Sequence, residues 1–114
     1  MQLAAVLLAA APGMAAPEPP QERIEAGARL ARDTRKGNCL ACHAMPSDPA
    51  AVTSANVGPP LQAMKQRFPD RERLRQQIWD AASRNPDTVM PPFGRNRILT
   101  GNEIDLIIEY LYTL

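Results

Sequence analysis

Metal-binding side chains are scarce in this sequence. Its 114 residues include two cysteines and a single histidine, and aromatic residues make up only 4%. A structural zinc site draws on four ligands, so a chain with three cysteine and histidine side chains disfavours one. The shortage of aromatic residues also leaves little bulk for a core, and a large apolar prosthetic group would supply what is missing.

An excess of charge of one sign is also lacking, because 13 basic residues are balanced by 12 acidic ones, for a net charge of +1. The charges are nonetheless sorted along the chain. Basic residues dominate between positions 65 and 97, whereas the closing segment after position 100 carries acids alone. We expect most of these basic residues to form a solvated helix face, with some free to pair with a cofactor's carboxylates or to steer an acidic partner.

The apolar run over residues 3–11 is too short to span a bilayer but long enough for the core of a signal peptide. Small residues at positions 13–15 predict cleavage after Ala15 or Ala16, although no lysine or arginine precedes the run. We therefore predict a signal peptide over residues 1–15, an extended leader over 16–20 and one domain over 21–114. This organisation predicts export to the periplasm, with no membrane span in the mature chain. The alternative is an N-terminal core helix.

Both cysteines and the histidine fall within the motif Cys39-Leu40-Ala41-Cys42-His43. Two thiols three positions apart, followed directly by an imidazole, are typical of covalent haem attachment. On one helical turn Cys39 and Cys42 would point the same way, so both sulfurs could form thioethers with one porphyrin. His43 would then offer its Nε2 atom to the iron as proximal ligand. A thioredoxin-like dithiol would need a βαβ pattern that the sequence lacks, and a chance occurrence on a core helix is the other alternative.

A haem iron needs a sixth ligand, for which methionine thioethers are the plausible candidates. A thioether opposite histidine favours ferrous iron. Met45 follows His43 too closely to reach the opposite face of the ring, and Met64 lies in a segment rich in lysine and arginine. Met90 is separated from the haem motif by a predicted helix and is framed by prolines, so we expect it to be the distal ligand. The alternative is a loop methionine that packs on the core.

Proline, alanine and small polar residues without periodicity predict a loop from position 44 to position 60. Within this loop, the carbonyl oxygen of Pro59 is free to accept a hydrogen bond from His43 Nδ1. Such a bond would fix the tautomer of an iron-bound imidazole and raise its basicity. A plain turn proline is the alternative.

Three helices and no strand pattern predict an all-α fold. Residues 21–36 combine good helix formers with an apolar face, and Gly37 is placed to end this helix in a left-handed conformation. Gly27, inside the same helix, indicates either a close helix crossing or a tolerated surface glycine. A second helix is predicted over residues 70–83, with an aspartate as its N-cap. The last helix opens with a capping box and continues as an apolar stripe, formed by Thr100, Glu103, Ile104, Ile107, Ile108 and Leu111.

The haem motif is followed by residues 57–61 (Val-Gly-Pro-Pro-Leu), by residues 85–94 (Asn-Pro-Asp-Thr-Val-Met-Pro-Pro-Phe-Gly) and by the closing residues 110–114 (Tyr-Leu-Tyr-Thr-Leu). From about Arg23 to the end, this order of motifs resembles the SoxX family, the monohaem c-type cytochrome subunits of the periplasmic thiosulfate-oxidising (Sox) system. All c-type cytochromes share the haem motif, whereas residues 85–94, which we call the methionine loop, are more specific. One departure is Ser-Ala-Asn at 54–56, where a glycine is commoner.

The resemblance implies a class I cytochrome c fold and one covalent haem c, with His43 and Met90 as iron ligands and Pro59 supporting the histidine. It also implies a heterodimer with a SoxA-like haem protein, together forming the L-cysteine S-thiosulfotransferase that couples thiosulfate to a carrier-protein cysteine. The sulfur chemistry is then expected on the partner, while this chain accepts electrons, has no catalytic residue of its own and passes electrons to a downstream cytochrome. The alternatives are a free-standing soluble periplasmic electron carrier and a haem-based gas sensor or peroxidase. Binding to nucleic acid is not expected.

Overall fold

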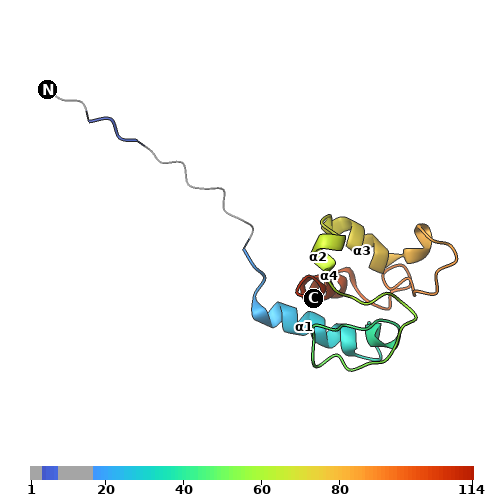
Figure 1. Cartoon of the computed structure of the whole chain (residues 1–114). Helices are drawn as coiled ribbons and strands as arrows, with labels where there is room; N and C mark the ends of the chain where they lie inside the picture. Colours follow the sequence, from blue (N-terminus) through green and yellow to red (C-terminus); the bar gives the residue numbers. More distant parts are fainter. Residues whose placement is uncertain (1–3, 8–16) are drawn as a thin grey trace.

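The regular structure of this chain is helical, as the sequence predicts. A computed structural model describes residues 4–7 and 17–114, and within these residues it contains no strand (Figure 1). The all-α prediction is therefore confirmed. The elements in chain order are α1 (Gln21–Arg32), a 3-10 turn (Cys39–Ala41), α2 (Met64–Arg67), α3 (Arg71–Trp79), a second 3-10 turn (Ala81–Ser83) and α4 (Gly101–Leu111).

Most of the predicted signal peptide lies outside the described residues, as do Ala15 and Ala16, the two predicted cleavage positions. Residues 4–7 are exposed and have no regular structure. Among the residues that the structure describes, no helix has the length and apolar character needed to cross a membrane. The signal peptide and the leader therefore stay predictions.

The first and last helices cross closely at Gly27. A Cβ atom added there would collide with the backbone carbonyl group of Leu106 in α4 and would lie 3.1 Å from the Cβ of Tyr110. Ion pairs stand on both sides of the crossing, with Arg23 Nε 2.9 Å from Glu109 Oε2 and a second pair between Lys36 and Glu103. Gly27 therefore permits the helix crossing, and it is not a tolerated surface glycine.

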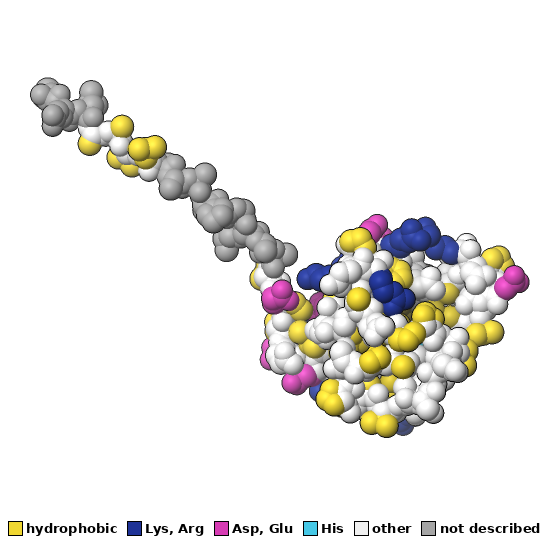
Figure 2. Space-filling view, in the orientation of Figure 1, with side chains coloured by type: hydrophobic (Ala, Val, Ile, Leu, Met, Phe, Trp, Pro, Cys, Tyr) yellow, Lys and Arg dark blue, Asp and Glu magenta, His cyan; other side chains and the backbone are white. Residues whose placement is uncertain are grey.

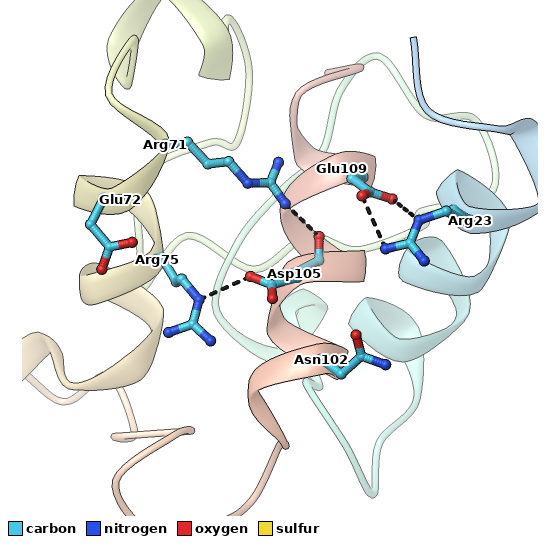
Figure 3. A pocket seen from close by; sticks show the side chains of 7 residues that line it. All are labelled: Arg23, Arg71, Glu72, Arg75, Asn102, Asp105 and Glu109. Atoms are coloured by element: carbon cyan, nitrogen blue, oxygen red, sulfur yellow. Dashed lines mark hydrogen bonds and ion pairs between the residues drawn. The ribbon is translucent and has the colours of Figure 1, made fainter. Parts of the chain in front are cut away.

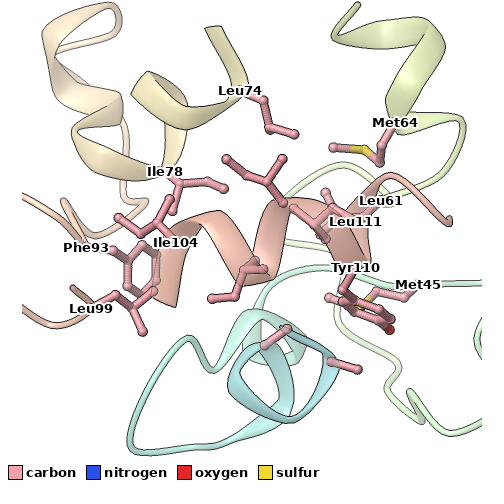
Figure 4. Close-up of a cluster of buried hydrophobic side chains, with 14 of the residues drawn as sticks. Met45, Leu61, Met64, Leu74, Ile78, Phe93, Leu99, Ile104, Tyr110 and Leu111 are labelled. Atoms are coloured by element: carbon pink, nitrogen blue, oxygen red, sulfur yellow. The ribbon is translucent and has the colours of Figure 1, made fainter. Parts of the chain in front are cut away.

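The core forms around α4, whose apolar stripe faces both α1 and α3 (Figure 4). Ile104, Ile107 and Ile108 are at most 1% exposed. The helix starts where predicted, because Thr100 Oγ1 accepts a hydrogen bond from the Glu103 N–H at 3.1 Å and the Glu103 side chain accepts one from the Thr100 N–H at 3.0 Å. Tyr110 and Leu111 of the same helix are also buried. The other buried apolar residues of the core come from the remaining helices and the loops: Ala28, Ala31, Met45, Ala51, Leu61, Met64, Leu74, Ile78, Phe93 and Leu99.

The first helix ends at Arg32, four residues earlier than predicted, and Gly37 is not its left-handed cap. The carbonyl oxygen of Asp33 accepts hydrogen bonds from the N–H groups of Lys36 and Asn38, both at 3.0 Å, so the chain turns there. The left-handed residue is Asn38, with φ of 47°. Gly37 is needed for space instead, since a Cβ there would lie 2.9 Å from the Leu30 carbonyl oxygen and 3.2 Å from Cys39 Sγ.

The helix predicted over residues 70–83 is α3, and it ends at Trp79 rather than at Ser83. The Trp79 carbonyl oxygen, which a longer helix would have used internally, accepts hydrogen bonds from the N–H groups of Gly94 and Arg95, each at 3.1 Å. Docking of the methionine loop thus ends the helix. The single-turn helix α2 is not predicted by the sequence pattern; it follows Ala63, which has a φ of 50°, and it buries Met64.

Candidate functional site

The two thiols and the imidazole lie on a single tight turn. Asn38 opens this turn in the left-handed region, and the N–H groups of Cys42 and His43 both donate to the Cys39 carbonyl oxygen, at 3.2 and 2.9 Å. The predicted helical turn is thus a 3-10 turn. Both cysteines are free thiols and partly buried. The arrangement holds two nucleophilic sulfurs and a nitrogen ligand within five consecutive residues.

The thiol of Cys39 lacks the character of a redox-active dithiol. Its pKa is raised to about 11, chiefly by burial and to a smaller extent by the neighbouring Cys42, while a backbone hydrogen bond acts in the opposite direction. Thioredoxin-like sites do the reverse and stabilise a thiolate near neutral pH. The thioredoxin-like alternative is therefore disfavoured by the local environment as well as by the helical fold.

The imidazole of His43 is oriented by the loop that follows it. Its Nδ1 atom lies 2.6 Å from the carbonyl oxygen of Pro59, so the structure brings these two predicted residues together. Because a carbonyl oxygen only accepts, Nδ1 carries the proton in this contact and the lone pair of Nε2 is left free for a metal. The neighbouring Gly58 donates its N–H to the Cys42 carbonyl oxygen at 2.8 Å.

Gly58 is a site residue that sequence reasoning did not single out. A Cβ atom at this position would lie 2.6 Å from Nδ1 and 2.8 Å from Nε2 of His43, so any larger residue would push the imidazole aside. The backbone of the loop can pass directly over the ring because residue 58 has no side chain. A glycine immediately before the supporting proline was the signal that could have identified it.

The loop around Met90 is fixed at its backbone. Thr88 Oγ1 accepts a hydrogen bond from the Met90 N–H at 3.2 Å, and the Thr88 N–H donates to the Asn85 carbonyl oxygen at 3.1 Å. Beyond the two prolines, Phe93 is buried in the core and the following residues bind the Trp79 carbonyl oxygen. The loop therefore presents its methionine from a backbone held on both sides.

The three methionines of the described chain differ in what surrounds their sulfur atoms. Met45 and Met64 are 1% exposed and lie in the core beside α4 (Figure 4). The Met45 sulfur is 3.5 Å from the Tyr110 hydroxyl, and the Met64 sulfur is 3.5 Å from an Arg67 nitrogen. Met90 is only partly buried, with its sulfur 3.6 Å from Gln77 Nε2. The two competing methionines are thus occupied in core packing, which leaves Met90 as the more available thioether.

A recess of about 510 Å³ lies between α1, α3 and α4 and is lined mainly by charged side chains (Figure 3). Arg23 makes two bonds to the Glu109 carboxylate, at 2.9 and 3.1 Å, and Arg75 Nε lies 2.9 Å from Asp105 Oδ1. Arg71 donates to the Asp105 backbone carbonyl oxygen at 3.2 Å. These basic residues are therefore partnered by groups of the helices that line the recess.

The sorted charges of the sequence remain sorted on the surface. In the view of Figure 2, basic side chains gather at the top of the molecule, over the region of α2 and α3, while acidic ones lie beside the start of α1 and at single positions elsewhere. Two acidic residues of α4 form ion pairs within the fold, Glu109 with Arg23 of α1 and Asp105 with Arg75 of α3. The basic face thus belongs to the middle of the chain, as predicted.

The donor set fits a covalent haem. Two free thiols share one turn, the adjacent imidazole has its Nδ1 engaged and its Nε2 available, and a glycine leaves room for the ring. Within residues 4–7 and 17–114, no group of three or more histidine, cysteine, aspartate and glutamate side chains is arranged to hold a metal ion. An iron held by a porphyrin needs only two protein ligands.

Comparisons with known proteins agree with this geometry. The cytochrome c family model matches residues 24–114. Among solved structures, SoxXA from P. pantotrophus matches with a TM-score of 0.69 and 25% identity, over 78% of this chain and 79% of that one. The c-type cytochrome SorU from Sinorhizobium meliloti matches with a TM-score of 0.57 and 28% identity, over 82% and 92% of the two chains.

A curated relative is an uncharacterized lipoprotein from Aquifex aeolicus (strain VF5), 34% identical over 79 residues. The match covers 69% of this chain and 37% of the relative, so the chain spans little more than a third of that protein's length.

Proposed function

This chain belongs to the cytochrome c family, and from that premise we propose that it binds one haem c through Cys39 and Cys42, with His43 and Met90 as the iron ligands. Its all-α architecture is the class I cytochrome c fold, and its role is electron transfer. When bound, the haem supplies an iron that alternates between ferric and ferrous states and so stores one electron.

Different residues of the chain attach the haem and bind its iron. Cys39 and Cys42 anchor the porphyrin, and Pro59 holds His43 in the tautomer that leaves Nε2 free to bind iron. Met90 supplies a neutral thioether, which favours the reduced iron and raises the reduction potential. The observation that supports this assignment best is the 2.6 Å contact between His43 Nδ1 and the Pro59 carbonyl oxygen, because it orients the imidazole as a ligand.

Replacing Met90 tests the distal ligand. Met90→Ala should open the sixth coordination position, abolish the thioether-to-iron charge-transfer band of the ferric protein and lower the reduction potential. Met64→Leu is the matched control, because it changes a buried methionine of the core and should leave both readouts unchanged. An unaltered spectrum and potential in Met90→Ala would remove Met90 from the site.

The finer proposal is that the chain acts in the periplasm as the SoxX-type subunit of a thiosulfate-coupling enzyme, accepting electrons from a SoxA-like partner. The TM-score of 0.69 to SoxXA supports it, together with coverage of about four fifths of both chains. In this arrangement the sulfur chemistry takes place on the partner. The electrons then leave this chain for a downstream cytochrome.

Association with a partner is the measurement that tests the finer proposal. Haem absorbance should be followed through size-exclusion chromatography of the native periplasm, with each fraction probed for this chain. Elution together with a second, SoxA-like haem protein supports the subunit role. Elution alone near its own mass supports a free-standing electron carrier, a second candidate favoured by the match to SorU over 92% of that cytochrome.

A further inference from the structure

The loop that follows the haem motif runs alongside it and bonds to its backbone carbonyl groups. The Gly58 N–H donates to the Cys42 carbonyl oxygen at 2.8 Å. Further along, the Leu61 N–H donates to the Ala44 carbonyl oxygen, also at 2.8 Å. Each later donor of the loop meets a later carbonyl of the motif, so the two segments run in the same direction. These two bonds lie on either side of His43.

Thr53 adds a side-chain bond at the start of this row. Its hydroxyl donates to the Leu40 carbonyl oxygen at 2.8 Å and accepts the N–H of Ala55 at 3.0 Å. In a longer 3-10 turn the His43 N–H would bond to the Leu40 carbonyl oxygen, but it bonds to that of Cys39 instead, at 2.9 Å. The Thr53 hydroxyl therefore takes the place of that backbone donor.

Side-chain packing does little to hold the segment between Thr53 and Pro59. Val57 is 66% exposed, and Ser54, Asn56 and Pro59 are exposed as well. A segment with few buried contacts moves easily unless its backbone is bonded to the rest of the fold. The position of the Pro59 carbonyl oxygen therefore depends on the hydrogen bonds at the two ends of this segment.

We propose that Thr53 is a positioning residue for the imidazole of His43. By tying the loop to the haem motif, its hydroxyl keeps the Pro59 carbonyl oxygen close to Nδ1 and thereby lowers the reduction potential of the haem iron. The inference rests on the proposed ligation of haem iron by His43. The effect of Thr53 reaches the iron through the loop and the imidazole.

The chemistry of the imidazole gives the direction of the effect. An Nδ1–H that donates to a carbonyl oxygen leaves more electron density on the ring, so Nε2 becomes a more basic ligand. A more basic nitrogen stabilises ferric iron more than ferrous iron, because the ferric ion carries the larger charge. Loss of the Thr53 hydroxyl should weaken the Nδ1 contact and so favour the reduced form.

Removal of this hydroxyl should leave the rest of the loop in place. On the N-terminal side of Thr53, Asp48 accepts hydrogen bonds from the Tyr110 hydroxyl and from Arg32. On the C-terminal side, Leu61 is buried in the core. The change should therefore be confined to the segment between these two anchors, without a change in fold.

The test compares Thr53→Val with Thr34→Val in the haem-loaded protein. Both variants replace a threonine hydroxyl by a methyl group, one bonded to the haem motif and one exposed ahead of it. At a fixed electrode potential, Thr53→Val should raise the ferrous-to-ferric ratio about threefold, which corresponds to about 28 mV for a one-electron couple. Nuclear magnetic resonance of the ferrous protein should show the His43 Nδ1 proton exchanging with deuterium about threefold faster. Thr34→Val should change neither quantity.

Further variants separate the hydroxyl from the shape of the side chain. Thr53→Ser keeps the hydroxyl and should retain both native values. Thr53→Ala removes it without adding a methyl group and should match Thr53→Val. In the Met90→Ala background, Thr53→Val should change the ratio by the same factor, because the imidazole and the thioether bind opposite sides of the iron.

If Thr53→Val behaves like Thr34→Val in both readouts, the role of Thr53 is wrong and the haem ligation stands. A change in one readout without the other would also overturn this role, as would an effect that disappears in the Met90→Ala background. If His43→Ala keeps the native spectrum of the haem protein, the ligation by His43 fails and the inference fails with it.

Discussion

At the scale of single residues, the carboxylate of Asp48 links three parts of the chain. It accepts hydrogen bonds from the Tyr110 hydroxyl of α4, from Arg32 of α1 at 3.0 Å and from the Ala50 N–H of its own loop at 2.8 Å. These contacts, the one from Tyr110 foremost, lower the pKa of Asp48, and its partial burial opposes them. The ionised form of Asp48 is therefore favoured by folding.

The stability of the fold should depend on pH through this carboxylate. A carboxyl whose pKa is lower in the folded state stabilises the protein above its unfolded pKa of about 3.9, and the contribution is lost as the pH falls. Asp48→Asn should be less stable than the unmodified protein at pH 7 by roughly 1–2 kcal/mol. The difference should shrink as the pH falls from about 5 to 3, because protonation removes the advantage of the natural residue.

Urea unfolding at several pH values measures this effect. Asp87→Asn, at an exposed position in the methionine loop, serves as the control for removal of a negative charge. A constant stability difference between Asp48→Asn and the unmodified protein from pH 7 to pH 3 would contradict the prediction.

Residue-level reasoning can propose the haem motif because its chemistry depends on residue type and spacing alone, and the roles of Cys39, Cys42 and His43 in binding haem stay predictions. The contact between His43 and Pro59 could also be anticipated, since a proline carbonyl has no competing partner in an irregular loop. The need for Gly58 could not, because it depends on which distant residue lies opposite it. The assignment of Met90 as ligand stays a prediction.

At the scale of helices, the close crossing of α1 and α4 depends on the absence of a side chain at Gly27. Gly27→Ala would gain about 1 kcal/mol in helix propensity, but its Cβ would collide with the Leu106 carbonyl group of α4. Because a backbone group cannot move aside without shifting the helix, we expect a net loss of about 1–3 kcal/mol.

Gly101→Ala is the matched control, since the one close contact of the added Cβ, at 2.7 Å, would be with the flexible end of Arg75, and Trp79 would lie at an ordinary contact distance of 3.9 Å. The midpoint of urea unfolding should fall for Gly27→Ala and stay level or rise slightly for Gly101→Ala. Equal stability of the two variants would show that the helices can separate at little cost.

The helix ends that the sequence predicts accurately are those with capping residues next to them in the chain. The capping box places the start of α4 at its observed position, and Asp70 caps α3 through its side chain as expected. The ends of α1 and α3 were predicted too late, because tertiary partners end both. The Trp79 carbonyl oxygen accepts hydrogen bonds from the methionine loop, and the Asp33 carbonyl oxygen accepts them from the turn that leads to the haem motif.

At the scale of the whole molecule, the core is aliphatic and centred on α4, with Phe93 and Tyr110 as its buried aromatic residues among those described. A porphyrin attached at Cys39 and Cys42 would contribute a large apolar surface to such a core. The protein without haem should therefore be poorly folded.

The double variant Cys39→Ser/Cys42→Ser should lose much of its helical circular dichroism, whereas Cys42→Ser alone, with one thioether left, should retain most of it. A native helical spectrum in the double variant would show that the polypeptide folds without the cofactor.

The pairing of α1 with α4 also sets an order of events during synthesis. The segment that α1 packs against is made about 80 residues after it, so this contact is long-range and slow to form. Until α4 emerges, the turn bearing Cys39 and Cys42 has no core beneath it. Until the two helices meet, both thiols are therefore more open to reaction than in the folded chain, where they are partly buried.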